Sequence, residues 1–192
     1  MTGTPADILA LVEAAYRQHF EVLPARASVS FVGVDPIEVL RYSDGAVDHY
    51  LTLGMARHPM ADPAEAVVAT STAPRAELLL IAAGRPDRLW HALAVLAAAP
   101  AVEGAVYLPG NRIDLGEPLS PGSRCTGAVL VGSQVQPVAV SGTADVQVLR
   151  VLPATQTELA WARVHGSEQL HRRWQDTNTD LTNLLRDPVD LS

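Results

Sequence analysis

The sequence contains no lysine, and positive charge is scarce overall. All 14 basic residues are arginine, against 21 acidic residues, so the formal net charge is −7 at pH 7. An acidic chain without a basic run repels the phosphate backbone of nucleic acids. We therefore expect no nucleic-acid partner, and the cluster His171-Arg172-Arg173 is too short to alter that expectation.

Cysteine and long apolar runs are also scarce. The single cysteine, Cys125, excludes an internal disulfide and is typical of a reducing compartment. The longest stretch without a polar residue, Ala92 to Val102, is shorter than the roughly 18 residues of a membrane-spanning helix. The N-terminus lacks the basic start of a secretory signal and carries Asp7 and Glu13. These features predict a cytoplasmic protein with no membrane partner.

The length and composition favour one folded domain. A chain of 192 residues can bury one good hydrophobic core, and it shows neither an internal repeat nor a dividing linker. Hydrophobic residues make up 48% of the chain and charged residues 18%, which is typical of a globular protein. We expect a single domain over residues 1–192.

Two segments carry the clearest strand patterns. In residues 47–53 (VDHYLTL), apolar and polar side chains alternate, which predicts a half-buried strand, with His49 on the apolar face beside Leu51 and Leu53. The dipeptide Asp44-Gly45 predicts a hairpin turn before it. Residues 76–82 are almost continuously apolar, as in a strand covered on both faces. We expect Leu51, Leu53, Leu78 and Leu80 to be buried in one sheet.

The remaining elements complete the predicted fold class. Further strands are predicted at 28–34, 37–42, 126–131, 135–140 and 145–152. Helices are predicted at 5–20, at 86–99 with Pro100 ending it, from the capping box Thr155–Glu158 to Gly166, and from Ser167 onward. Residues 61–74 and 103–123 are predicted as loops, the first of them mobile. The order predicts an α+β fold with a mixed, largely antiparallel sheet and flanking helices.

The sequence lacks the patterns of known catalytic and metal sites. The six histidines show no metal-ligand spacing, and there is no G-x-S-x-G elbow or phosphate-binding glycine motif. Cys125 begins an apolar strand, which favours a buried thiol over a nucleophile. Asp114 and Glu117 are expected in an exposed loop. We therefore expect no enzymatic activity, no metal and no cofactor; the alternative is an enzyme or small-ligand-binding protein that uses loops 54–74 and 103–123.

Five groups of motifs occur in an order that matches a known family. They are Leu51–Met55 with Pro59-Met60; Ala76–Leu80 before the helix around Trp90; Gly110–Ile113 with Gly116–Leu119; Val148–Pro153 with Glu158–Ala160 and His165-Gly166; and Asp180–Arg186. Together they span about residues 30–190 and resemble the suppressor of fused (SUFU) domain family, in particular its bacterial single-domain members.

The resemblance implies a protein-binding function. The family's animal member is a two-domain, non-enzymatic regulator that sequesters a zinc-finger transcription factor, whose peptide adds as a strand between the domains. This chain resembles only the first of those domains. The aspartate that contacts the partner there corresponds to Asn111 here, and a helix tyrosine falls near Ala99. Bacterial members are often proposed as immunity proteins against toxins, so the resemblance implies either an immunity protein or a sequestering partner.

The segment 103–119 is the candidate docking surface for a protein partner. Its glycines keep the backbone approachable, Tyr107 and Ile113 would offer apolar contact, and Asn111 and Arg112 would fix the register through hydrogen bonds. The alternative is an exposed connector without a partner. Reversing the charge of Arg112 together with Ile113→Asp is expected to abolish capture at little cost in stability. If capture survived, the acidic loop 61–74 would be the next candidate.

Overall fold

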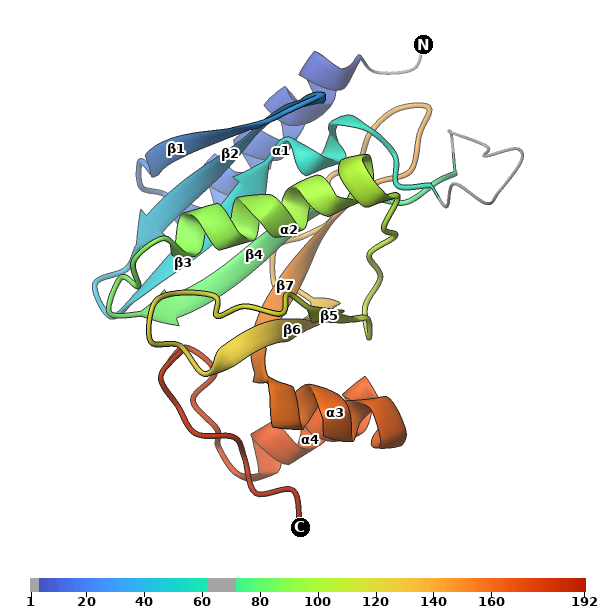
Figure 1. Cartoon of the computed structure of the whole chain (residues 1–192). Helices are drawn as coiled ribbons and strands as arrows, with labels where there is room; N and C mark the ends of the chain where they lie inside the picture. The colour runs from blue at the N-terminus through green and yellow to red at the C-terminus, as the bar shows by residue number, and fades with distance from the viewer. Residues whose placement is uncertain (1–3, 62–71) are drawn as a thin grey trace.

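A seven-stranded mixed sheet forms the centre of the protein. The computed structural model describes residues 4–61 and 72–192 (Figure 1). The strand order is β1-β2-β3-β4-β7-β6-β5; β4 and β7 run parallel, and the other neighbours run antiparallel. The predicted α+β fold with a mixed, largely antiparallel sheet is therefore confirmed. Most of the loop predicted at 61–74 lies outside the described residues.

The elements have the following bounds. They are α1 (Pro5–Phe20), β1 (Ala25–Phe31), β2 (Val34–Ser43), β3 (Val47–Leu53), the short 3₁₀ helix η1 (Met55–Arg57), β4 (Arg75–Ala83), α2 (Leu89–Glu103), β5 (Arg112–Asp114), β6 (Cys125–Gly132), β7 (Val146–Thr155), α3 (Gln156–His165) and α4 (Ser167–Asp176). No helix in the described ranges is long and apolar enough to cross a membrane.

Helices cover both faces of the sheet. Figure 1 shows α2 in front of the sheet and α1 behind it, with α3 and α4 at the end where the chain terminates. Alternate residues of β7 point to opposite faces of the sheet. Val148 packs with apolar residues of α1, and Leu149 and Val151 pack with apolar residues of α2. Leu152 packs beneath α3 and α4. The sheet is therefore buried on both sides.

Two helices begin where the sequence predicted, because their caps satisfy free backbone donors. The Thr4 hydroxyl accepts from the backbone N–H of Asp7, and the Asp7 carboxylate accepts from the backbone N–H of Thr4. Thr155 and Glu158 form the same reciprocal pair at the start of α3. A capping box of this kind depends only on residues three apart, so it is readable from sequence.

The prediction for residues 47–53 was right about the strand and wrong about its half-burial. Leu51 and Leu53 are buried beneath α1, but Tyr50 and Thr52 on the opposite face are buried as well. Helix α2 covers that second face, which alternation within one strand cannot reveal. His49 is partly exposed on the α1 side, where its ring lies 5.3 Å from that of Phe20. Leu78 and Leu80 are fully buried, as predicted.

The predicted break between the first two strands was misplaced. The chain turns at Val32-Gly33, with Gly33 at φ +80°, and Pro36 lies inside β2. The β1–β2 register shifts between the pairs Phe31–Val34 and Val29–Ile37. Proline is tolerated at this irregularity because a ladder hydrogen bond is already missing there.

Helix α2 begins three residues later than predicted and continues through Pro100 instead of ending before it. Proline lacks the N–H that would bond to the carbonyl of Leu96, four residues earlier. The Tyr107 hydroxyl donates to the Leu96 carbonyl instead, at 3.1 Å. A tertiary hydrogen bond thus replaces the donor that Pro100 lacks, and the helix ends at Glu103 with Gly104 at φ +69°.

The strand predicted at 135–140 does not form. This segment makes a single antiparallel bridge, Val138 to Val146, and Pro137 has no N–H to extend it. Val135, Val138 and Val140 are nevertheless buried in the cluster under α1. The apolar pattern of this segment therefore indicates that it packs against the core, and it does not indicate a strand of the sheet.

Candidate functional site

Strand β5 is an edge of the sheet and lies within the segment predicted as the docking surface. Among the strands that the structure describes it pairs with β6 alone, through the register Arg112–Val129, Ile113–Ala128 and Asp114–Gly127. Figure 1 shows it as a short strand outside β6, near the end of the segment that follows α2. An edge strand presents unpaired backbone donors and acceptors, which can accept another strand.

The hydrogen-bond alternation of β5 shows which backbone groups face outward. The carbonyl of Asn111 accepts from Leu130, and the N–H of Leu115 donates to Thr126. Backbone groups alternate in direction along an antiparallel strand, so Asn111, Ile113 and Leu115 face β6. The N–H and C=O groups of Arg112 and Asp114 therefore point away from the sheet.

The close approach of β5 to β6 depends on Gly127. A Cβ atom at this position would lie 2.1 Å from the Ile113 carbonyl oxygen and 2.6 Å from the Leu159 Cδ1 atom. The β6–β7 register shifts between Cys125 and Gly127. Only glycine leaves room for the β5 backbone at this irregularity, so a residue outside the predicted segment positions its edge strand.

The structure separates the four predicted partner-binding residues. Tyr107 is buried: its hydroxyl bonds to Leu96, and its N–H contacts the Met60 sulfur at 3.4 Å. It therefore belongs to the core and is not available to a partner in this conformation. The side-chain oxygen of Asn111 accepts from the N–H of Leu108 at 2.7 Å, which holds the turn before β5.

Arg112 and Ile113 occupy β5 itself but point to opposite faces. Arg112 is exposed, and its guanidinium reaches the Ser167 hydroxyl at the start of α4 at 3.4 Å. Ile113 is half-buried and packs against the main core. The small stability cost expected for Ile113→Asp together with charge reversal at Arg112 assumed that both residues are exposed, which is wrong for Ile113. That change places a carboxylate against the core, so we now expect a larger cost. Asp114 and Glu117 are exposed, as predicted.

A buried carboxylate that sequence reasoning missed shapes the loop after β3. Glu77 is fully buried, and it accepts from the Thr52 hydroxyl at 2.6 Å and from the N–H groups of Gly54 at 2.8 Å and Ala56 at 3.0 Å. Burial raises the pKa of Glu77, although these hydrogen bonds oppose the rise. A polar residue inside the apolar run 76–82 was the one available signal.

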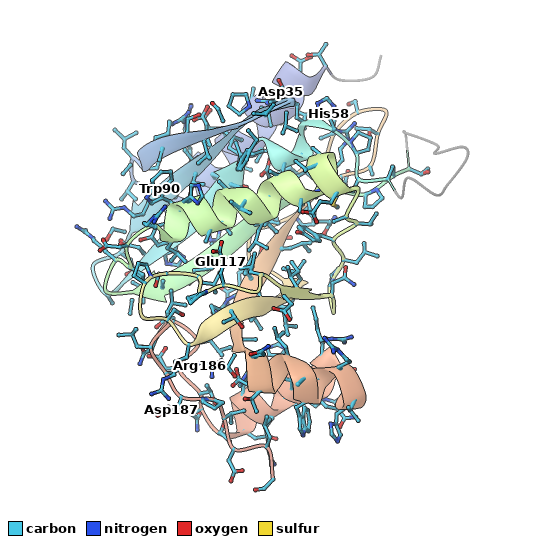
Figure 2. All side chains as sticks on the ribbon, viewed as in Figure 1. Asp35, His58, Trp90, Glu117, Arg186 and Asp187 are labelled. Atoms are coloured by element: carbon cyan, nitrogen blue, oxygen red, sulfur yellow. The ribbon has the colours of Figure 1, made fainter. Side chains whose placement is uncertain are left out.

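Several titratable side chains form surface pairs or are buried singly in the described part of the chain. The His58 ring and the Asp35 carboxylate lie 3.2 Å apart on the surface (Figure 2). His165 is remote in sequence from that pair, and its ring stacks on the Trp161 ring with the two centroids 4.1 Å apart. Within residues 4–61 and 72–192, no group of three His, Cys, Asp or Glu residues could hold a metal ion. Cys125 is buried, and burial raises the pKa of its thiol.

Comparisons with known proteins agree with this architecture. Among solved structures, the chain is similar to a protein described as a SUFU homolog from Neisseria gonorrhoeae FA 1090, with a TM-score of 0.74, 14% identity, and 97% and 99% of the two chains covered. It is similar to a chain of the Sufu–Fu complex, with a TM-score of 0.67, 14% identity and coverage of 98% and 92%. Drosophila Suppressor of Fused gives a TM-score of 0.67 at 14% identity.

The similar structures differ in how much of their own length is matched by this chain. The aligned region takes in 95% of this chain but 50% of the Drosophila protein, so this chain spans about half of that relative's length. Comparison with curated protein sequences finds no match. The family model for suppressor of fused protein (SUFU), in contrast, matches residues 33–187, most of the chain. The chain belongs to the suppressor of fused protein family.

Proposed function

We propose that the protein is a non-enzymatic protein-binding module that receives a partner segment along the outer edge of β5. The observation that carries this proposal is the outward-facing backbone of Arg112 and Asp114 on the terminal strand of the sheet. A partner strand added there would gain main-chain hydrogen bonds, and side chains beside the edge would supply selectivity. The structurally similar Sufu chain occurs in a complex with Fu, which supports a binding role in this fold.

The surface around this edge suits a protein partner. Leu108 is 48% exposed on the turn before β5, and Arg112 adds an exposed cation. The net charge of −7 favours a partner that carries a basic surface, because opposite charges raise association rates. Within this function, an immunity protein that sequesters a basic toxin is the more specific form of the proposal.

The test compares two variants at one position. Asp114→Pro removes the outward N–H while leaving the inward groups of Ile113 and Leu115 in place. Asp114→Ala keeps that N–H. Both variants lose the bond from the Gly116 N–H to the Asp114 carboxylate, so they share that loss. We expect Asp114→Ala to retain, and Asp114→Pro to lose, a specific partner captured from the protein's own cells.

Folding and identity controls complete the experiment. Thermal melting of both variants must show a native transition, since only then does lost capture report the edge. Partners retained equally by both variants would show that the β5 edge is not the docking site, and β1 at the other end of the sheet would replace it. If the protein has an immunity function, the captured partner should be toxic when expressed alone, and co-expression of this protein should protect the cells. A captured partner that is not toxic would contradict the immunity function.

A further inference from the structure

A pocket of about 330 Å³ lies at the opposite end of the sheet from β5. The first residues of β1, the middle of β2 and β3, and the loop leading into α2 form its walls. Its lining includes Arg26, Arg41, Arg85, Arg88, Tyr50 and Trp90. The volume falls within the range of about 300–1,000 Å³ that holds small ligands. No described residue of the predicted ligand-binding loops, 54–74 and 103–123, lines it.

The charges around this pocket leave a positive excess in an acidic protein. Arg41 and Arg85 both contact one oxygen of Asp48, at 3.4 Å and 3.2 Å, so two cations share a single carboxylate. The guanidinium of Arg88 has no hydrogen-bond or ion-pair partner within residues 4–61 and 72–192, and only its backbone carbonyl is bonded, to the N–H groups of His91 and Ala92. Counting Asp87 as well, three arginines face two carboxylates, which leaves a net charge of +1.

Arg26 does not add to that excess. Its guanidinium pairs with Glu13 and with Glu38, and Glu13 also pairs with Arg17. Two cations and two carboxylates thus form a neutral network. The positive excess is confined to Arg41, Arg85 and Arg88, beside the start of α2.

The loop before α2 holds its arginines in unusual backbone conformations. Arg85 has φ +50°, and Arg88, the N-cap residue, has φ +60°. The left-handed region is uncommon for residues other than glycine, and such strain concentrates at functional sites. Arg88 makes no side-chain capping bond, so the positive end of the α2 dipole adds to the arginine charge.

Aromatic side chains supply the remaining wall. Trp90 is 39% exposed at the N-terminal end of α2, where Figure 2 shows it beside the sheet. Tyr50 also lines the pocket and is buried. A site that combines the unpaired guanidinium of Arg88, two arginines that share one carboxylate and a partly exposed indole suits an anion attached to a flat ring.

We propose that this pocket binds a small organic phosphate that carries an aromatic ring, with Arg88, Arg85 and Arg41 around the phosphate and Trp90 against the ring. This binding site is separate from the β5 edge and does not depend on it. The occupant is a small molecule because the volume of about 330 Å³ lies at the low end of the range for small-ligand pockets.

Phenyl phosphate is the probe, and the three tryptophans give a built-in comparison. In a ¹H–¹⁵N spectrum of the whole chain, we expect a saturable shift of the Trp90 indole N–H. Trp161 and Trp174 lie on α3 and α4, away from this pocket, so their indole signals should stay in place. Inorganic phosphate should shift the same signal more weakly, and phenol should leave it unchanged.

Arg88→Gln tests the phosphate contact against a matched control. Arg163→Gln also removes one exposed arginine whose side chain has no partner among the described residues, but from α3. The two variants carry the same net charge, so any difference between them is local. We expect Arg88→Gln to weaken binding about tenfold or more and Arg163→Gln to leave it nearly unchanged.

Several results would overturn the proposal. One is an affinity for phenol equal to that for phenyl phosphate, which would show that the pocket recognises the ring and not the phosphate. Another is an unchanged affinity in Arg88→Gln, and a third is the absence of any saturable shift at millimolar phenyl phosphate. Tighter binding of a short acidic peptide at the same signal would assign the pocket to a protein side chain instead.

Discussion

At the scale of single residues, Glu77 is the clearest case of a polar side chain with a structural task. Its carboxylate takes hydrogen bonds from Thr52 and from the N–H groups of Gly54 and Ala56. The same Thr52 hydroxyl accepts from the N–H of Leu78, and the carbonyl of Thr52 accepts from the Tyr16 hydroxyl. One buried acid thereby links β3, β4, η1 and α1.

Replacing Glu77 should separate the loss of its acceptors from the loss of its charge. Glu77→Ala leaves three buried donors unsatisfied and should cost about 3 kcal/mol or more of unfolding free energy. Glu77→Gln keeps an acceptor for the backbone groups and should cost much less. Urea unfolding monitored by circular dichroism measures both values, and a similar cost for the two variants would contradict the role given to the acceptors.

The pH dependence of Glu77 has a definite sign. Its pKa in the folded state is raised above the ordinary value of 4.5, so the folded state binds the proton more tightly than the unfolded chain. The stability that it contributes therefore falls as pH rises from about 4.5 through the folded-state pKa. The stability of the native protein relative to Glu77→Gln should decline across that window, with exposed Glu117→Gln as the control. A relative stability that rises with pH would contradict the shift.

At the scale of elements, the β5–β6 pair shows how one glycine positions an edge strand. Ile113 and Asp114 lie against the backbone of Gly127, and the absence of a side chain there lets the strands pair. The edge proposed for partner binding therefore depends on a residue of the neighbouring strand.

Gly127→Ala should destabilise the protein and displace β5. The added methyl would overlap the Ile113 carbonyl, and overpacking of this kind costs about 1–3 kcal/mol or more. Gly132→Ala on the same strand is the control, because nothing lies within 4 Å of its Cβ position. Hydrogen exchange at the Ile113 amide should accelerate only in the first variant. Equal exchange in both variants would mean that β5 pairs without needing Gly127.

At the scale of the whole molecule, a second buried carboxylate attaches the C-terminal segment. Glu158 accepts from Arg186 at 2.7 Å and 2.9 Å, from the Trp174 indole at 2.9 Å and from the Val189 N–H at 3.0 Å. Burial alone would raise the pKa of Glu158, but bonds from Arg186, Val189 and Thr155 outweigh it and lower the pKa. This group joins α3, α4 and the tail; Figure 2 marks Arg186 beside Asp187 on that tail.

Removing this charge should cost far more than removing an exposed one. Glu158→Gln leaves the Arg186 guanidinium buried without its ion pair, a change that costs about 3–5 kcal/mol. Glu168→Gln breaks the exposed pair with Arg172 and should cost about 0.5 kcal/mol or less. Urea unfolding at pH 7 compares them, and similar costs would contradict the importance of burial.

The effect of Glu158 should also disappear in acid. Because its pKa is lowered in the folded state, its stabilisation is present above the unfolded value of 4.5 and is lost as pH falls through the folded-state pKa. The stability difference between the native protein and Glu158→Gln should therefore shrink below about pH 4.5. A difference that stays constant down to pH 3 would contradict the lowered pKa.

Much of the fold could be predicted from the sequence, because its signals are local. The capping box Thr155–Glu158 places α3, the apolar run 76–82 places β4, and the turn at Asp44-Gly45 places β3. Ordered motifs also identified the family. Each signal involves residues a few positions apart, whose backbone preferences act before the chain is compact.

The candidate site could be predicted only in part, because its geometry depends on distant contacts. The sequence located the segment that contains β5 but took Tyr107 for a surface residue. Its hydroxyl instead satisfies the carbonyl that Pro100 leaves free, a contact between residues 11 positions apart. The arginine pocket was missed because four separate segments supply its walls.

The sequence by itself determined most of the helices and strands, the fold class and the family, since periodicity, caps and turns are set by neighbouring residues. Tertiary structure decided which faces were covered, where Pro100 was accommodated, which backbone groups of β5 face outward, and where the arginines gather. Those outcomes depend on the packing of strands and helices that are remote in sequence. Burial, charge pairing and edge exposure exist only once that packing is in place.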